Sequence, residues 1–127
     1  MLTWTSTVAH IVLTGLEAPA QADLGRLLSQ QGHQVTIGWE GGLGTADALF
    51  CNGDEPAYPL LVQRVRGLRP DLPVVVVTRL PDTAKWLDAL EAGAADYCCA
   101  PFETVQVCWL LSAVLGLSAG RTKPTAV

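Results

Sequence analysis

The chain has 127 residues, the length of a single domain, of which 50% are hydrophobic and 16% are charged. This composition excludes a disordered chain. The formal net charge of -4 excludes a stand-alone nucleic-acid-binding module, because such modules depend on basic residues that displace counterions from phosphates. The longest apolar run, 105–115, is too short to span a membrane, and the first residues do not resemble a secretion signal. We therefore expect a cytoplasmic globular protein.

The four cysteines do not indicate a metal site, because no two of them are spaced as Cys-x-x-Cys. Cys98 and Cys99 are adjacent, and neighbouring residues in a strand point to opposite faces of a sheet. We therefore expect reduced thiols that pack like small hydrophobic side chains, with no bound metal.

Short apolar runs alternate with amphipathic stretches along the chain. Strands are expected over residues 9–14, 34–39, 46–51, 74–77 and 95–99, and helices over 19–31, 59–68, 82–92 and 103–117. The run 74–77 consists of valines and is apolar on both faces, which is typical of a central strand in a parallel sheet. The alternation predicts an α/β fold with a doubly wound parallel sheet, whose functional edge lies at the carboxyl ends of the strands.

The connection between the second and third expected strands is unusually short. Only residues 40–46 lie between Trp39 and Asp47, whereas a parallel crossover normally takes a dozen or more residues and a helix. We therefore expect an irregular glycine-rich loop in place of a helix. The domain is expected over residues 9–117, with an N-terminal extension at 1–8 and a tail or the start of a linker at 118–127.

Three stretches, 68–78, 89–97 and 100–102, together resemble the receiver domain of two-component response regulators. The resemblance extends over about residues 9–117. It implies a flavodoxin-like sandwich with five parallel strands in the order 2-1-3-4-5, here with the second helix shortened or missing. In that family an acidic pair after the first strand holds Mg²⁺ and an aspartate at the end of the third strand accepts phosphate. A threonine or serine ends the fourth strand, and a lysine that neutralises phosphoryl oxygens precedes Pro-Phe after the fifth.

The residues that carry this chemistry are replaced here. Asn52 stands at the phosphoacceptor position, and an amide cannot form an acyl phosphate. Ala100 replaces the lysine. Only the two switch positions match the family, with Thr78 and Tyr97. The degenerate acidic-pocket positions, which offer no paired metal ligands, are Gly15, Leu16 and the adjoining Glu17. The resemblance therefore implies a pseudo-receiver that is not an enzyme and holds neither metal nor cofactor.

Other interpretations of this edge remain open. Glu17, Asp54 and Glu55 could form a displaced cation site, although solvated loop carboxylates are the simpler expectation. The Asn52-Gly53 pair could deamidate and restore an aspartate, although the metal ligands would still be missing. For Thr78 and Tyr97, static packing is expected rather than a rotameric switch.

The last expected helix carries no charge over residues 104–117, so both of its sides are apolar. We expect one stripe, which includes Val105, Cys108, Trp109 and Leu115, to pack on the sheet. The other stripe is then an exposed interaction surface. The resemblance implies a homodimer through the fourth helix, fifth strand and fifth helix of the family, with Trp86 as an aromatic anchor. The predicted interface residues are Trp86, Val107, Leu110, Leu111, Val114 and Leu117.

Two functional hypotheses follow. The first is an atypical receiver domain in bacterial two-component signal transduction that works by protein contact without aspartyl phosphorylation, and that contacts neither nucleic acid nor membrane. The alternative is a sensor that binds a small ligand in the vacated pocket between Gly15, Asn52, Thr78 and Ala100.

Overall fold

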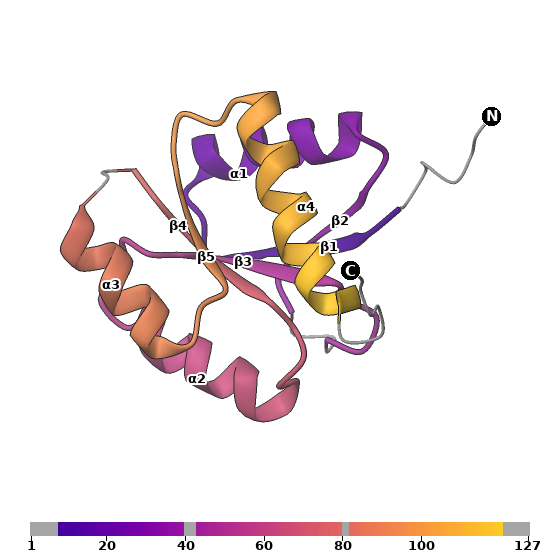
Figure 1. Cartoon of the computed structure of the whole chain (residues 1–127). Helices are drawn as coiled ribbons and strands as arrows, with labels where there is room; N and C mark the ends of the chain where they lie inside the picture. Colours follow the sequence, from indigo (N-terminus) through magenta and orange to yellow (C-terminus); the bar gives the residue numbers. More distant parts are fainter. Residues whose placement is uncertain (1–7, 40–42, 80–81, 121–127) are drawn as a thin grey trace.

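The computed structural model describes residues 8–39, 43–79 and 82–120, with the backbone only for 116–120. Strands and helices alternate along these residues (Figure 1). The strands are β1 (His10–Thr14), β2 (Gln34–Ile37), β3 (Ala48–Asn52), β4 (Val74–Thr78) and β5 (Asp96–Cys99). The helices are α1 (Ala18–Gln30), α2 (Tyr58–Leu68), α3 (Thr83–Ala92) and α4 (Thr104–Gly120).

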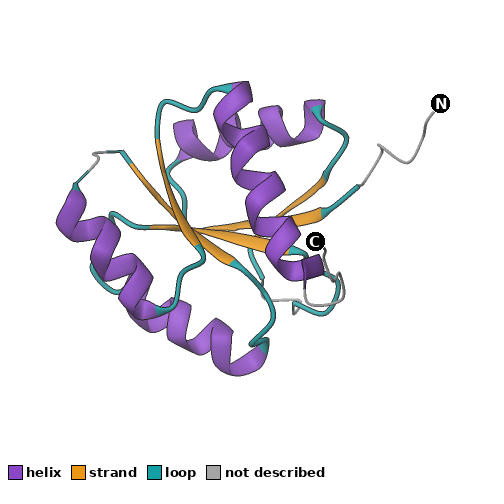
Figure 2. Ribbon diagram, in the orientation of Figure 1, coloured by secondary structure: helices purple, strands orange, loops and turns teal. Residues whose placement is uncertain are grey.

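The strands form one parallel sheet in the order β2-β1-β3-β4-β5, which confirms the predicted fold class (Figure 2). The register pairs Thr14 with Cys51, and Asn52 with Val77. The carboxyl ends of β1, β3 and β4 therefore lie level with one another at one edge of the sheet. This edge is where ligands bind in open α/β folds.

Helices cover both faces of the sheet. Helices α1 and α4 lie on one face, and α2 and α3 lie on the other (Figure 1). Strand β4 is buried along its whole length, as expected for a valine run whose side chains point alternately to two covered faces. Among the residues described, none of the helices has the length and hydropathy needed to cross a bilayer.

A loop takes the place of a helix between β2 and β3. Its described residues, 38–39 and 43–47, form turns and bends, and the rest of the expected loop lies outside the described residues. Leu43 and Ala46 are buried against the sheet face that α2 covers. The guanidinium of Arg69, just after α2, donates hydrogen bonds to the carbonyl oxygens of both residues. These contacts satisfy backbone acceptors that a helix would otherwise have paired.

The prediction of which side of the last helix faces the sheet is wrong. Val105 and Trp109, expected to pack inward, are 68% and 76% exposed, and Cys108 is also exposed. The stripe expected at an interface is buried in the core instead, because its aliphatic side chains recur at i, i+3, i+4 and i+7 and form one continuous face. These buried residues are Val107, Leu110, Leu111 and Val114.

The remaining expectations for α3 and α4 are met in part. Leu115 is partly buried and packs against the core, as expected, whereas the side chain of Leu117 lies outside the described residues. Helix α4 continues to Gly120, three residues beyond the expected end of the domain. The spacing of Leu87 and Leu90 in the sequence predicts that these two residues of α3 face the sheet, but both are exposed, and the residue of α3 that is buried is Ala89. The small Ala89 side chain lets α3 lie close to the sheet.

Candidate functional site

The loops at the carboxyl edge begin with two glycines whose positions restrict the backbone. Gly15 follows β1 with φ of 72°, a left-handed conformation that side chains disfavour. Gly53 follows β3 and donates its N–H to the carbonyl oxygen of Val77, 2.6 Å away. A Cβ atom on Gly53 would collide with the side chain of Val76. The loop after β3 therefore lies tightly against β4.

Asn52, at the end of β3, uses both ends of its amide within the protein. Its Nδ2 donates to the carbonyl oxygen of Gly15 at 3.0 Å, and its Oδ1 accepts from the backbone N–H of Asp54 at 2.9 Å. The second bond closes an Asx-type turn that fixes the loop after β3. The amide thus links the loops that follow β1 and β3.

Asp54 is the most highly bonded side chain of the site. Its Oδ1 accepts from the Thr78 hydroxyl at 2.5 Å, and its Oδ2 accepts from the backbone N–H of Arg79 at 3.1 Å. The Arg79 guanidinium and the Lys85 ammonium lie 3.3 and 3.7 Å from the carboxylate oxygens. Burial raises the pKa of the Asp54 carboxyl, but the hydrogen bonds from Thr78 and Arg79 and the charge of Lys85 together hold it below its ordinary value.

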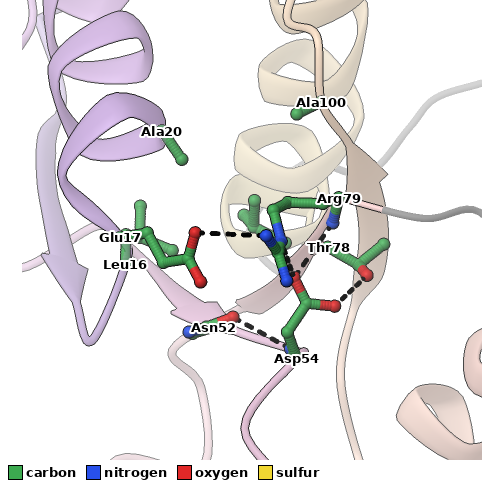
Figure 3. A pocket seen from close by; sticks show the side chains of 9 residues that line it. Leu16, Glu17, Ala20, Asn52, Asp54, Thr78, Arg79 and Ala100 are labelled. Atoms are coloured by element: carbon green, nitrogen blue, oxygen red, sulfur yellow. Dashed lines mark hydrogen bonds and ion pairs between the residues drawn. The ribbon is translucent and has the colours of Figure 1, made fainter.

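The Arg79 side chain bridges the carboxylates of Glu17 and Asp54, as Figure 3 shows. Its NH1 lies 3.6 Å from an oxygen of Glu17. The cavity that remains between these side chains has a volume of about 10 Å³, close to the minimum for one water molecule. Its lining residues are Leu16, Glu17, Ala20, Asn52, Asp54, Val77, Thr78, Arg79 and Ala100.

The two switch-equivalent residues are connected to this network. Thr78 is buried, with 1% of its surface exposed, and its hydroxyl donates to Asp54. The hydroxyl of Tyr97 forms hydrogen bonds with the Thr78 side chain and the Asp82 backbone. Burial raises the pKa of the Tyr97 hydroxyl in spite of these bonds. A hydrogen-bonded series therefore runs from Tyr97 through Thr78 to Asp54.

The structure brings together most of the site residues singled out in the sequence. Leu16, Glu17, Asn52, Thr78 and Ala100 line one cavity. Gly15 is connected to it because its carbonyl oxygen accepts a hydrogen bond from Asn52, and Tyr97 is connected to it through Thr78. The expectation that the carboxylate of Asp54 is solvated is wrong, because its side chain is 16% exposed and fully paired. Sequence reasoning considered Asp54 only as a candidate cation ligand or a solvated carboxylate. It foresaw neither the pairing of Asp54 with Arg79, just after β4, nor that with Lys85 in α3.

The open alternatives for this edge can be judged from the same contacts. Within the described ranges, no three His, Cys, Asp or Glu side chains are placed to hold a metal ion. Glu17 and Asp54 instead face the guanidinium of Arg79. A pocket for a small molecule usually measures about 300–1,000 Å³, so the cavity of about 10 Å³ does not fit the predicted ligand sensor. Arg79 lines this cavity and pairs with both of its carboxylates.

No protein-family model matches the sequence, and no curated protein matches it either. Solved structures do match. NtrX from Brucella abortus superposes with a TM-score of 0.81 at 17% identity, over 91% of this chain and 29% of NtrX. A CheY-like response regulator receiver domain protein from Methanospirillum hungatei JF-1 gives 0.74 at 18% identity, over 91% of this chain and 99% of that one.

A putative pilus assembly-related protein from Burkholderia pseudomallei K96243 gives a TM-score of 0.77 at 24% identity, over 92% of this chain and 96% of that one. This chain spans 29% of the length of NtrX, and it spans nearly all of the other two proteins. The TM-scores show that the fold is shared, and at identities this low the likeness concerns the fold alone. The chain is thus similar in structure to response regulator receiver domains, with the five-stranded parallel sheet and flanking helices that they share.

Proposed function

We infer that this chain is a receiver-like signalling module that acts through protein contact, without accepting a phosphoryl group and without catalytic activity. The observation that carries this inference is the position of Asn52 and the hydrogen bonds of its amide. Its amide lies where the resemblance places a nucleophilic carboxylate, and both ends of it are hydrogen-bonded to the backbone of neighbouring loops. An amide in this position offers no anionic oxygen for attack on a phosphoryl donor.

The charges beside Asn52 support the same inference. A receiver needs carboxylates free to bind Mg²⁺ and a cation free to neutralise phosphate. Here the carboxylates of Glu17 and Asp54 are paired with Arg79, and Lys85 also faces Asp54. The site is electrically balanced by its own side chains. Among the described residues that line the cavity, each charged side chain is already paired with one of opposite charge.

The hydrogen-bonded series gives the module a single resting arrangement. The carboxylate of Asp54 holds the Thr78 hydroxyl, which in turn bonds with the hydroxyl of Tyr97. In this proposal the protein keeps Thr78 and Tyr97 in one conformation without a bound anion. The surface that partners meet is then always present, so signalling depends on the abundance of the module or of its partner.

The test is incubation with acetyl phosphate or beryllofluoride in the presence of Mg²⁺, followed by intact-mass measurement and NMR. The unmodified protein is expected to show no adduct and no shift of the amide resonances around residue 52. Asn52→Asp is a matched control that restores the nucleophile without the metal ligands or the lysine, and it is expected to remain largely unmodified. A stoichiometric, base-labile phosphoryl adduct on the wild-type protein would falsify the proposal, and its loss in Asp54→Asn would place the phosphoryl group on Asp54.

The partner expected from the sequence is a second copy of this chain. That homodimer stays a prediction, and the measurement that decides it is the molar mass in solution as a function of concentration. The predicted contact through Val107, Leu110, Leu111 and Val114 is not possible in this fold, because these side chains are buried in the core. A contact through this side of the molecule must use Trp86, which is 43% exposed, and the exposed side of α4.

A further inference from the structure

The segment from Trp86 to Leu115, which forms most of α3 and all of β5, carries carboxylates but no lysine or arginine. The cation nearest in sequence, Lys85, is turned toward Asp54 and the candidate site. Arg66, which contacts Gly93, comes from α2 on the opposite face of the sheet from α4. The acidic residues of the segment are Asp88, Glu91, Asp96 and Glu103.

A groove lies between the edge strand β5 and α4, and its volume is about 280 Å³. Among the described residues that line it, Asp96 is the only charged one. Trp109 stands beside it with 76% of its surface exposed, and Leu110 forms part of its floor. The described residues that line it are Asp96, Tyr97, Cys98, Gln106, Trp109, Leu110 and Ala113.

This combination of side chains suits a particular chemistry. An exposed indole attracts a guanidinium or ammonium group through its electron-rich face, and guanidinium groups also stack on it. The carboxylate of Asp96 adds a charge-assisted acceptor at the same groove. The apolar part of the wall can pack against the aliphatic stem of an arginine or lysine side chain.

We propose that the groove between β5 and α4 is the docking site for a basic segment of a different protein, which inserts an arginine or lysine side chain between Trp109 and Asp96. A second copy of this chain is the wrong occupant. An isologous dimer places the same surface against itself, so the acidic segment would face its own carboxylates. This inference rests on the proposed function, since it names the kind of partner that the module contacts.

The probes are two end-capped helical peptides, one of leucine and arginine and a matched one of leucine and glutamate. The full chain, labelled with ¹⁵N, is titrated with each while its amide and indole resonances are followed by NMR. The leucine–arginine peptide is expected to shift the Trp109 indole N–H and the amides of β5. The leucine–glutamate peptide is expected to shift neither.

Two variants identify the contacts, and a third controls for net charge. Asp96→Asn and Trp109→Ala are each expected to weaken leucine–arginine peptide binding by about five-fold or more. Trp109 is exposed, and Asp96 is half-buried with an oxygen that accepts from the backbone N–H of Tyr97. An asparagine oxygen can accept the same bond, so both variants are expected to keep the native NMR spectrum elsewhere. Asp23→Asn, which removes an exposed carboxylate from α1, is expected to leave the affinity within about two-fold.

Equal binding of the two peptides overturns the inference, as does the absence of leucine–arginine peptide binding. The inference is also overturned if neither Asp96→Asn nor Trp109→Ala changes the affinity for the leucine–arginine peptide, or if the protein forms a homodimer in which the Trp109 indole is buried. None of these results depends on phosphorylation. If the peptide titration fails and no phosphoryl adduct forms, only the docking site is refuted and the proposed function stands. If a phosphoryl adduct forms, the proposed function is refuted regardless of the result of the peptide titration.

Discussion

Replacing Asp54 by asparagine tests the charged network of the site most directly. The wild-type carboxylate accepts hydrogen bonds from the Thr78 hydroxyl and the Arg79 backbone N–H. Water competes little for these bonds, because the Asp54 side chain is only 16% exposed. An asparagine has one acceptor oxygen, so its NH₂ group must face one of these two donors. A hydrogen bond to a charged group contributes about 1.5–3 kcal/mol, and the exposed ion pair with the Arg79 side chain contributes about 0.5 kcal/mol or less.

The expected loss of unfolding free energy in Asp54→Asn is therefore about 2–3 kcal/mol near neutral pH. Urea denaturation followed by tryptophan fluorescence measures it as a lower midpoint with an unchanged slope. The matched control is Asp23→Asn, which removes an exposed pair with Arg26 and is expected to cost about 0.3–0.5 kcal/mol.

The pH dependence of this difference has a defined sign. The pKa of Asp54 is lower in the folded protein than its ordinary value of 3.8. Its contribution to stability is therefore complete above that value and is lost as the pH falls through the lower, folded-state pKa. The gap between wild type and Asp54→Asn should close in acid. A variant no less stable than Asp23→Asn, or a gap that persists unchanged in acid, would refute the reasoning.

Three further outcomes are expected. Gly53→Ala should lose about 1–3 kcal/mol of unfolding free energy in urea, because the new methyl group collides with Val76, and an unchanged midpoint would contradict this. Burial lowers the pKa of His33 below 6.5, so an NMR titration should place its midpoint under that value. Stability should accordingly fall as the pH drops below 6.5, less so in His33→Gln, and equal pH profiles would argue against it. In native protein iodoacetamide should alkylate the exposed Cys108 but not Cys51, since burial raises the pKa of the Cys51 thiol to about 12; mass spectrometry of native and urea-unfolded samples decides this.

Part of the candidate site could be predicted from residue types and strand positions alone. Leu16, Asn52, Thr78 and Ala100 were placed together because each follows or ends a predicted strand at the same edge, and the cavity lining confirms that grouping. Arg79 directly follows the fourth strand, so the same rule places it at this edge. What the rule does not give is the direction in which a long side chain extends. Arg79 extends toward Glu17 and pairs with it, a contact between residues far apart in sequence.

The orientation of α4 shows a different limit. A helix without charges has apolar residues on every side, so hydrophobicity does not distinguish its buried face from its exposed one. In the sequence, the stripe that contains Trp109 and the stripe of Val107, Leu110, Leu111 and Val114 are both apolar enough to face the sheet. In the structure the aliphatic stripe packs on the sheet face that α1 also covers, and the indole of Trp109 is exposed to solvent.

By itself the sequence determined the alternation of strands and helices, the parallel sheet, the short link that replaces a helix and the amide at residue 52. These are local properties, since backbone periodicity and chemical identity do not depend on distant residues. Only the tertiary structure decided which helix faces turn inward, how Asp54 and Arg79 neutralise each other, and where a groove opens beside β5. Those features arise from contacts between segments separated along the chain, and the competition for space in a closely packed interior settles them.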